Sequence, residues 1–239
     1  MEHEIIGHSN KALKILRSPE KTFWEKTKEI LIEVLIIVFA VTFAAYIERS
    51  REQAKEQSEA KEFVLGFKND LKYEISHLKE SKKAMDAMIK SYSSIMKLKK
   101  ADVDSLEKNH IKSTFGISRF SSHAVNGRYD GFKSSGRIQT IEDDSLRNNI
   151  LTLQEEDLPF IDFSENIFNG NQKRLEDLLI NSSDAVGDKP VDVIKLLTSA
   201  KGKFILDFAL NYSTSVTKGY DGAIADAEKV IARIDKVYK

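Results

Sequence analysis

Apolar residues form one continuous run near the N-terminus. Residues 30–47 read ILIEVLIIVFAVTFAAYI, with a single charged side chain. A helix needs about 20 mostly apolar residues to cross the roughly 30 Å hydrocarbon core of a bilayer. Phe23 and Trp24 precede the run and Tyr46 lies at its far end, where aromatic side chains suit the two interfaces. The pattern predicts a transmembrane helix over residues 29–48. Cleavage after the small residues at its end, as in a signal peptide, is the alternative.

The helical pattern continues beyond this run over residues 49–100. Apolar side chains recur there at the three-and-four spacing of one helix face: Val64, Phe67, Leu71, Ile75, Leu78, Met85, Met88, Ile89, Tyr92 and Met96. The first part, ERSREQAKEQSEAKE, is polar all round. We expect one long helix whose charged part is a stalk. That stalk is either a solvated surface or a coiled-coil contact with another stalk.

The remaining chain, residues 101–239, returns to helix after a broken stretch over 101–128. One predicted stripe contains Leu146, Ile150, Leu153, Phe160, Phe163, Ile167, Phe168, Leu175, Leu178 and Leu179, with a break or kink at Pro159. A second, in a last helix over residues 204–238, contains Phe208, Tyr212, Val216, Tyr220, Ile224, Ala227, Ile231 and Ile234. The sequence therefore predicts an all-α protein. Its transmembrane helix continues into a stalk helix and an up-and-down helical bundle.

Composition narrows the functional classes. Basic and acidic residues number 37 each, so the concentrated positive field of a nucleic-acid-binding protein is not expected. The chain contains no cysteine, which excludes disulfides, thiolate chemistry and cysteine-ligated zinc.

Charge also predicts an orientation. Residues 1–28 hold six basic residues, Lys11, Lys14, Arg17, Lys21, Lys26 and Lys28, and residues 49–68 hold five, Arg49, Arg51, Lys55, Lys61 and Lys68. This small excess places residues 1–28 in the cytoplasm by the positive-inside rule. The chain is then expected to cross the membrane once, with the C-terminal domain outside the cytoplasm.

Glu33 lies inside the apolar run, one turn beyond Glu29. A carboxylate deep in a bilayer is costly and marks a partner or a proton path, whereas one near the edge reaches the headgroups. Glu33 is therefore a candidate for an intramembrane contact in an oligomer or complex. The alternative is an edge residue that reaches the headgroups or is protonated.

Two blocks of sequence resemble a known family. They are KTKEILIEVLIIVFAVTFAAYIERS at 26–50 and RYDGFKSSGRIQTIEDDSLRNNIL at 128–151. Both resemble the Bacteroidota family of single-pass proteins classed as domain of unknown function 6090. The matching positions are Tyr129, Phe132, Lys133, Ser134, Ser135, Gly136, Ile141, Asp143, Leu146 and Ile150. The first block departs from many members by ending in Tyr-Ile-Glu-Arg-Ser instead of an Ile-Asn-Trp-like sequence. The resemblance implies a cell-envelope protein, expected in a bacterial inner membrane with its C-terminal domain in the periplasm, and brings no known activity.

The Lys133–Ser134–Ser135–Gly136 run has two interpretations. Serine beside lysine can form a nucleophile and base, and serine-glycine backbone can bind an anion. The structural interpretation is a helix over 126–135 that stops at Gly136, with Asp143 or Asp144 capping the next helix. Tyr129 and Phe132, three residues apart, then anchor the turn in the core. The structural interpretation is favoured, with a partner or anion contact as the alternative.

Other candidate chemistry is sparse. The five histidines show no pair at i, i+3 or i+4, and no Glu-x-x-His motif occurs, so no metal site is expected. The acidic groups at 142–144 and 155–157 favour helix starts without a catalytic role. No phosphate-binding glycine loop is present. We expect no cofactor and no catalytic residue.

Three functions remain from this pattern. The first is a non-enzymatic interaction or scaffold protein of the bacterial envelope, an oligomer or a subunit of an inner-membrane complex. Its partners would be the lipid bilayer together with a second copy or another membrane protein. The second is an extracytoplasmic sensor that binds a small ligand between helices. An enzyme is the least supported because no catalytic constellation is visible.

Overall fold

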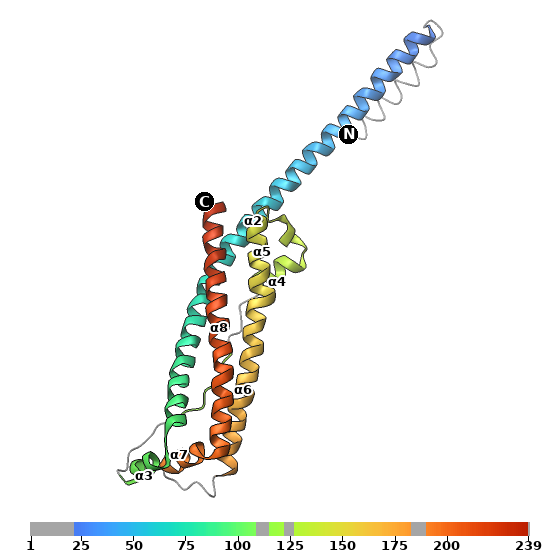
Figure 1. The fold of residues 1–239 in the computed structure, drawn as a ribbon. Coiled ribbons are helices and arrows are strands. Elements are labelled where there is room, and N and C mark those ends of the chain that lie inside the picture. Colours follow the sequence, from blue (N-terminus) through green and yellow to red (C-terminus); the bar gives the residue numbers. More distant parts are fainter. Residues whose placement is uncertain (1–21, 109–114, 122–126, 183–189, 239) are drawn as a thin grey trace. The chain divides into compact units, whose positions relative to one another are not determined.

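The computed structural model describes residues 22–108, 115–121, 127–182 and 190–238 (Figure 1). Within these residues it contains helices and no strand, which confirms the all-α class. Most of the expected cytoplasmic segment, residues 1–21, lies outside the described residues. The chain divides into two units, Met1–Glu59 and Ala60–Lys239, and helix α2 (Phe23–Lys97) contributes residues to both.

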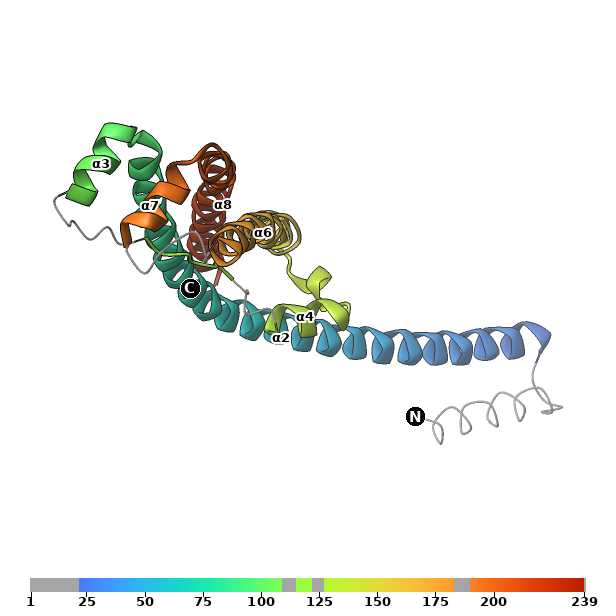
Figure 2. The same cartoon turned by 90° about the horizontal axis from the view of Figure 1, so that it is seen from below.

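The second unit is a helical bundle, as predicted. Its long members are the part of α2 from Ala60 onward, α6 and α8, which pack side by side (Figures 1 and 2). The elements after α2 are α3 (Lys100–Lys108), α4 (Gly127–Ser134), η1 (Arg137–Thr140), α5 (Asp144–Thr152), η2 (Leu153–Asp157), α6 (Leu158–Asn181), α7 (Pro190–Thr198) and α8 (Ala200–Val237).

Each long helix buries one seam with the alternating four-and-three spacing of a coiled coil. In α8 the seam residues are Gly202, Leu206, Ala209, Ser213, Val216, Tyr220, Ala223, Ala227, Val230 and Ile234. In α2 they include Ala60, Val64, Phe67, Leu71, Leu78, Met85, Tyr92 and Ile95. An average spacing of 3.5 residues keeps these side chains facing the neighbouring helices over many turns. The bundle core therefore runs the length of α6, of α8 and of the part of α2 from Ala60 onward.

Two predicted core aromatic residues lie outside this seam. Phe160 and Phe163 are 50% and 63% exposed. The predicted stripe placed Phe160 seven residues, or about two turns, after Leu153. The π-helical turn η2 between them holds one extra residue, so Ile161 takes the buried position instead. This part of the predicted core was wrong.

The helices do not simply alternate in direction. Tyr92, late in α2, bonds to Gln172, late in α6, whereas Lys68, early in the bundle part of α2, pairs with Asp235, late in α8. Helices α2 and α6 thus run parallel and α8 runs antiparallel to both (Figure 1). The chain returns between α2 and α4, which is the difference from the predicted up-and-down order.

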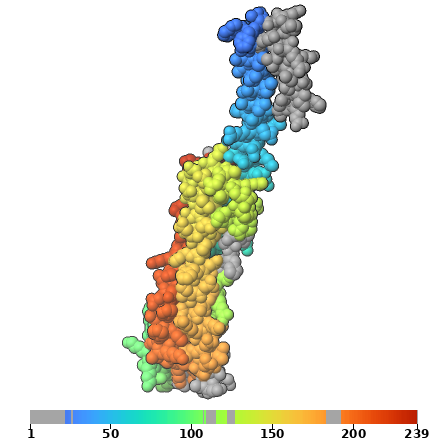
Figure 3. Space-filling view, turned by 90° about the vertical axis from the view of Figure 1, so that its right-hand side faces the viewer, coloured from blue at the N-terminus to red at the C-terminus, as the bar shows by residue number. Residues whose placement is uncertain are grey.

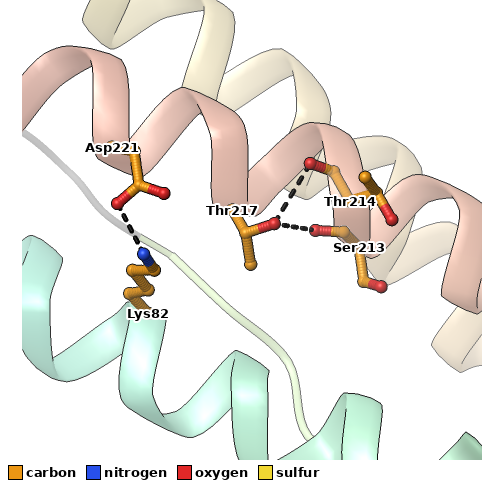
Figure 4. Close-up of polar contacts among 5 residues, drawn as sticks. All are labelled: Lys82, Ser213, Thr214, Thr217 and Asp221. Carbon is orange, nitrogen blue, oxygen red and sulfur yellow. Dashed lines mark hydrogen bonds and ion pairs between the residues drawn. The ribbon is translucent and has the colours of Figure 1, made fainter.

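Ion pairs line the seam between α2 and α8. Asp221, Glu228 and Asp235 are seven residues apart on α8 and pair with Lys82, Lys79 and Lys68 on α2. Figure 4 shows Lys82 and Asp221, whose atoms are 2.5 Å apart. Exposed pairs of this kind each stabilise a fold by less than about 1 kcal/mol. Their main consequence is the axial register of the two helices.

Part of the returning chain packs into the bundle. Residues 115–121 are not helical, yet Phe120 is only 7% exposed and meets Phe168 edge to face. The Asn169 amide accepts from the Phe120 N–H at 2.9 Å and donates to the Phe120 carbonyl at 2.6 Å. Asn169 therefore satisfies a backbone that has no neighbouring strand.

One extra residue between α5 and α6 is accommodated so that both helices keep their buried sides toward the core. The buried residues Leu153 and Leu158 are five apart, one more than the seam allows, and η2 between them is a π-helix. Leu158 N–H bonds to the Leu153 carbonyl, five residues back, so the extra residue is absorbed within one wide turn. Pro159 follows in the first turn of α6, where its missing N–H costs nothing. The predicted break at Pro159 is this wide turn, and the helical path continues through it.

The wide turn predicts which deletions the fold tolerates. Deleting Glu156 and replacing Pro159 by alanine restores a spacing of four from Leu153 to Leu158, so the melting transition in mild detergent should stay cooperative. The expected change in unfolding free energy is below about 2 kcal/mol, because no core contact is lost. Deleting exposed Asn166 instead rotates the rest of α6 by about 100° and should abolish cooperative melting. Equal damage from both deletions, measured by circular dichroism, would contradict the register argument.

A second prediction concerns Gly202 at the start of α8. A Cβ built there would lie 2.4 Å from the Leu196 carbonyl oxygen and 2.5 Å from that of Leu197. Gly202→Ala should therefore destabilise the bundle by about 1–3 kcal/mol, despite the better helix propensity of alanine. Gly131→Ala, where no atom lies within 4 Å, should stabilise it by about 0.5–1 kcal/mol. Thermal melts of the two variants should shift in opposite directions.

Candidate functional sites: the apolar segment and the turn between α4 and α5

The apolar segment of α2 exposes its side chains on all sides. Among the described residues, one helix, α2, is long and apolar enough to cross a membrane. Only 6% of its most apolar stretch of 18 residues is buried. Leu35, Phe39 and Phe43 are 58%, 68% and 53% exposed. The core helix of a soluble protein buries such side chains, whereas an all-round apolar surface suits lipid.

Glu33 differs from its neighbours in this segment. Its side chain is 7% exposed and is engaged in an interaction, whereas Ile32 and Val34 are 46% and 51% exposed. The carboxylate therefore does not project freely from the helix. Its expected role as a contact between copies or with a partner stays a prediction.

The serine-rich motif ends α4. Gly136 has a φ of 75°, the left-handed conformation that glycine adopts easily, and its N–H bonds to the Lys133 carbonyl at 2.9 Å. The Ser134 hydroxyl donates to the Gly131 carbonyl at 3.2 Å, and the Ser135 hydroxyl donates to the Phe132 carbonyl at 2.8 Å. Both hydroxyls thus satisfy carbonyls at the end of the helix. This geometry agrees with the structural interpretation of the motif.

Aromatic side chains hold the turn against α2. Tyr129 and Phe132 are 2% and 9% exposed. The Phe132 ring stacks on Phe63 with centroids 4.0 Å apart, and Tyr129 lies 6.4 Å from Phe67. Stacked aromatic pairs contribute about 0.5–1.5 kcal/mol beyond the area that they bury. The turn is therefore part of the bundle core.

A polar pair on the same turn joins α4 to α2. The Arg128 guanidinium pairs with Asp70 at 2.8 Å and lies directly over Gly66. A Cβ at Gly66 would be 2.4 Å from the guanidinium, so only a glycine at this position leaves room for the Arg128 side chain where it lies. Sequence spacing offered no sign of this contact, because 58 residues separate Arg128 from Asp70.

Lys133 and Tyr129 both contact Glu155. Lys133 Nζ lies 2.6 Å from the carboxylate, and the Tyr129 hydroxyl donates to it at 2.5 Å. Lys133 and then Tyr129 hold the pKa of Glu155 below its usual value. Burial, together with Glu155, raises the pKa of Tyr129. Glu155 had been expected only to favour a helix start; here it ties α4 to the wide turn.

Asp143 joins the turn to α8. Its carboxylate accepts the Leu146 N–H at 2.7 Å, which caps α5 as predicted. The same carboxylate accepts two hydrogen bonds from the Arg233 guanidinium, at 3.0 Å from Nε and 2.5 Å from Nη2. Arg233, followed by the Leu146 N–H, lowers the pKa of Asp143, with burial opposing. Of the remaining motif positions, Ile141, Leu146 and Ile150 are fully buried beside this bridge.

Two buried tyrosine pairs cross the core. The Tyr92 hydroxyl donates to Gln172 at 2.6 Å, and burial raises the pKa of Tyr92 to about 12. The Tyr220 hydroxyl donates to Glu165, and burial followed by Glu165 raises its pKa. Glu165 and Gln172 are 2% and 0% exposed. A buried polar group is costly unless bonded, so these pairs disfavour other alignments of the helices.

A carboxyl pair lies where the wide turn meets α8. Burial raises the pKa of Asp157, and Asp226 and Glu156 raise it further, with Lys229 opposing. Lys229 Nζ lies 2.6 Å from Asp226. The sequence grouped Asp157 with its neighbouring acids and could not show that Asp226, 69 residues later, faces it.

The motif geometry is poorly suited to catalysis. A lysine that acts as a base must be a neutral amine, and Lys133 lies in an ion pair with Glu155. The Ser135 hydroxyl is directed to a backbone carbonyl instead of to a base. Within the part of the chain that the structure describes, no three histidine, aspartate or glutamate side chains gather as a metal site would require. What the turn does physically is join α2, α5 and α8.

No protein-family model, curated protein or solved structure matches this chain. The resemblance to the family classed as domain of unknown function 6090 therefore stays a prediction.

The bridge from Asp143 to Arg233 predicts a pH dependence. Arg233 lowers the folded-state pKa of Asp143, so its stabilisation is present above the unfolded value of about 3.9 and is lost as pH falls through the folded pKa. Asp143→Asn keeps a capping oxygen and should be less harmful at pH 7 than Asp143→Ala, whose lost cap costs about 1 kcal/mol. In acid, the stabilities of wild type and Asp143→Asn should converge.

Exposed Asp104 provides the control for this experiment. Asp104→Asn should leave the stability-against-pH curve unchanged when urea unfolding is followed between pH 2 and pH 7. A constant gap between wild type and Asp143→Asn across this range would contradict the proposed bridge.

Proposed function

We propose that this chain is a membrane-anchored, non-enzymatic interaction or scaffold protein of the bacterial cell envelope. It acts as an oligomer or as a subunit of an inner-membrane complex. Residues 1–28 lie in the cytoplasm, α2 crosses the inner membrane once, and the bundle lies in the periplasm. The resemblance to the single-pass envelope family supports this location.

One observation carries the proposal: the apolar segment of α2 is exposed while the later part of the same helix is buried. Val38 and Phe39 are 54% and 68% exposed, whereas Val64 and Leu78 are fully buried. An exposed apolar surface of this length is unfavourable in water by about 25 cal/mol for each Å². Lipid removes this cost, so a bilayer is the first partner of the chain.

The polar contacts of the bundle support a role in binding without catalysis. Lys133, Asp143 and Arg128 each contact another helix through a charged pair. Their geometry stabilises the bundle and leaves no neutral base beside a free nucleophile. A rigid bundle of this kind can present a fixed surface to another protein.

Arginine substitutions test the anchor directly. Each arginine at the bilayer centre disfavours insertion by about 2.5–3.5 kcal/mol, so Leu35→Arg with Phe39→Arg should move the protein from carbonate-washed membranes to the soluble fraction. Gln53→Arg with Ser58→Arg adds the same charge in the polar stretch and should leave the protein in membranes. Membrane retention of the first variant, or a soluble wild type, would refute the anchor.

Orientation and partners need separate measurements. Alkaline phosphatase fused to Lys239 should be active, because this enzyme folds only outside the cytoplasm; an inactive fusion would reverse the assigned orientation. Purification in mild detergent should then yield a stable oligomer or a stoichiometric partner. A monomer that carries a small molecule would favour the ligand sensor instead.

A further inference from the structure

Helices α6 and α8 present aromatic rings where a bundle normally presents polar side chains. Along their outer edge lie Phe160, Phe163 and Ile167 on α6, and Phe204, Phe208 and Tyr212 on α8, which we call the aromatic face. Figure 3 shows the two helices packed side by side on one side of the bundle. The Phe208 ring lies 6.4 Å from Phe204 and 4.9 Å from Tyr212. The rings of α8 thus form a continuous row.

Exposure on this face is unusual for a soluble surface. Phe163 and Phe204 are 63% and 71% exposed and sit on the helix sides that point away from the core. Single exposed apolar residues are common, but a contiguous group marks a contact site. Core packing does not explain the rings, because the seam residues of α6 and α8 are already buried without them.

Of three glycines on the same face, only Gly219 has close neighbours among the described residues. A Cβ at Gly219 would lie 3.1 Å from Ile161 and 3.5 Å from the Phe160 ring, so a side chain there would crowd both. At Gly170 and Gly222 no atom lies within 4 Å. Glycine inside a helix costs about 1 kcal/mol relative to alanine. Gly170 and Gly222 are exposed and a Cβ there would meet only open space, so a partner can approach the backbone closely at both positions.

We propose that the aromatic face is the contact between two copies of this chain. This inference rests on the proposed function, because it names the surface by which the anchored protein self-associates. The face carries both exposed rings and positions without a side chain, so rings of one copy can lie against glycines of the other. Phe204 and Gly222 are eighteen residues apart, five whole turns, and lie in line along one side of α8. A two-fold axis brings rings of one copy against rings and glycines of the other.

The available area fits a dimer of this kind. Eighteen helical residues span about 27 Å, and two packed helices are about 20 Å wide, so each copy offers about 540 Å². The total of about 1,100 Å² lies just below the roughly 1,200–2,000 Å² of standard stable interfaces and within the range of weak ones. Attachment to the same membrane raises the effective concentration of the two copies, so an interface of this size is sufficient.

Charge also favours a second copy. None of the six side chains of the aromatic face is charged. Between Phe204 and Gly219 the exposed charges of α8 are one acid and one base, Asp207 and Lys218, so a strongly acidic or strongly basic partner finds no surface of opposite sign there. An apolar surface is the complement, and the chain supplies one itself.

The test uses the full chain in mild detergent, with its oligomeric mass measured by light scattering. Wild type should have twice the chain mass. Phe163→Glu with Phe204→Glu should weaken dimerisation by at least about tenfold, because buried charge is costly and aromatic contacts dominate interfaces. Both side chains are exposed, so the fold should be retained, as a thermal melt will verify. The matched control, Tyr73→Glu with Ile180→Glu, changes residues that are 63% and 66% exposed and should stay dimeric.

Cross-linking in membranes gives a second readout. The chain has no cysteine, so Ser215→Cys, between Tyr212 and Gly222 on α8, introduces the only thiol. Oxidation should yield a covalent dimer, whereas Ser76→Cys on the exposed side of α2 should not. A monomeric wild type, or dimers that persist in the Phe163/Phe204 variant, would overturn the proposal.

Two further results separate this inference from the proposed function. If the Phe163/Phe204 variant loses a different co-purifying protein while wild type contains a single copy, the face binds that protein and self-association is wrong. If wild type dimerises through the face but washes off membranes, the anchor is wrong and the dimer stands.

Discussion

The packing of α2, α6 and α8 along one seam is the constraint on which the rest of the structure depends. A seam with spacing of 3.5 residues faces its neighbours only while every helix keeps its phase. The wide turn before Pro159 exists because Leu153 and Leu158 are one residue too far apart for that phase. Gly202 is needed because α8 starts against the carbonyls of α7. The hydrogen bonds Tyr92–Gln172 and Tyr220–Glu165 then determine which residues of the neighbouring helices face each other.

Much of the bundle follows from local spacing, because a helix needs only near neighbours in sequence. The run from Val64 to Tyr92 predicted the buried face of α2, and the polar residues around it predicted its exposed face. The sequence could not show the relative directions of the helices, since these depend on the return of the chain before α4. The extra residue in the π-helical turn η2 was also hidden in the sequence, so Phe160 was predicted in the core in place of Ile161.

The turn between α4 and α5 was likewise predictable in its local residues and not in its distant contacts. Gly136 and Asp143 were predictable because a left-handed residue and a helix cap are properties of a few adjacent residues. Their distant partners were not. Glu155 lies 22 residues from Lys133, and Arg233 lies 90 residues from Asp143, so only the packed bundle brings them together. Local sequence specified the turn, and tertiary packing specified what it joins.

The pairing of α2 with α8 has a consequence for biosynthesis. Lys68 meets Asp235, 167 residues later, so the buried face of α2 has no α8 to cover it until the last residues have been made. At about 5–20 residues per second, translation of that interval takes roughly 8–33 s. The apolar segment leaves the ribosome before the bundle. During this interval Phe67 and Leu71 of the unfinished bundle are open to water. A chaperone that shields this face until translation ends would protect the chain from aggregation.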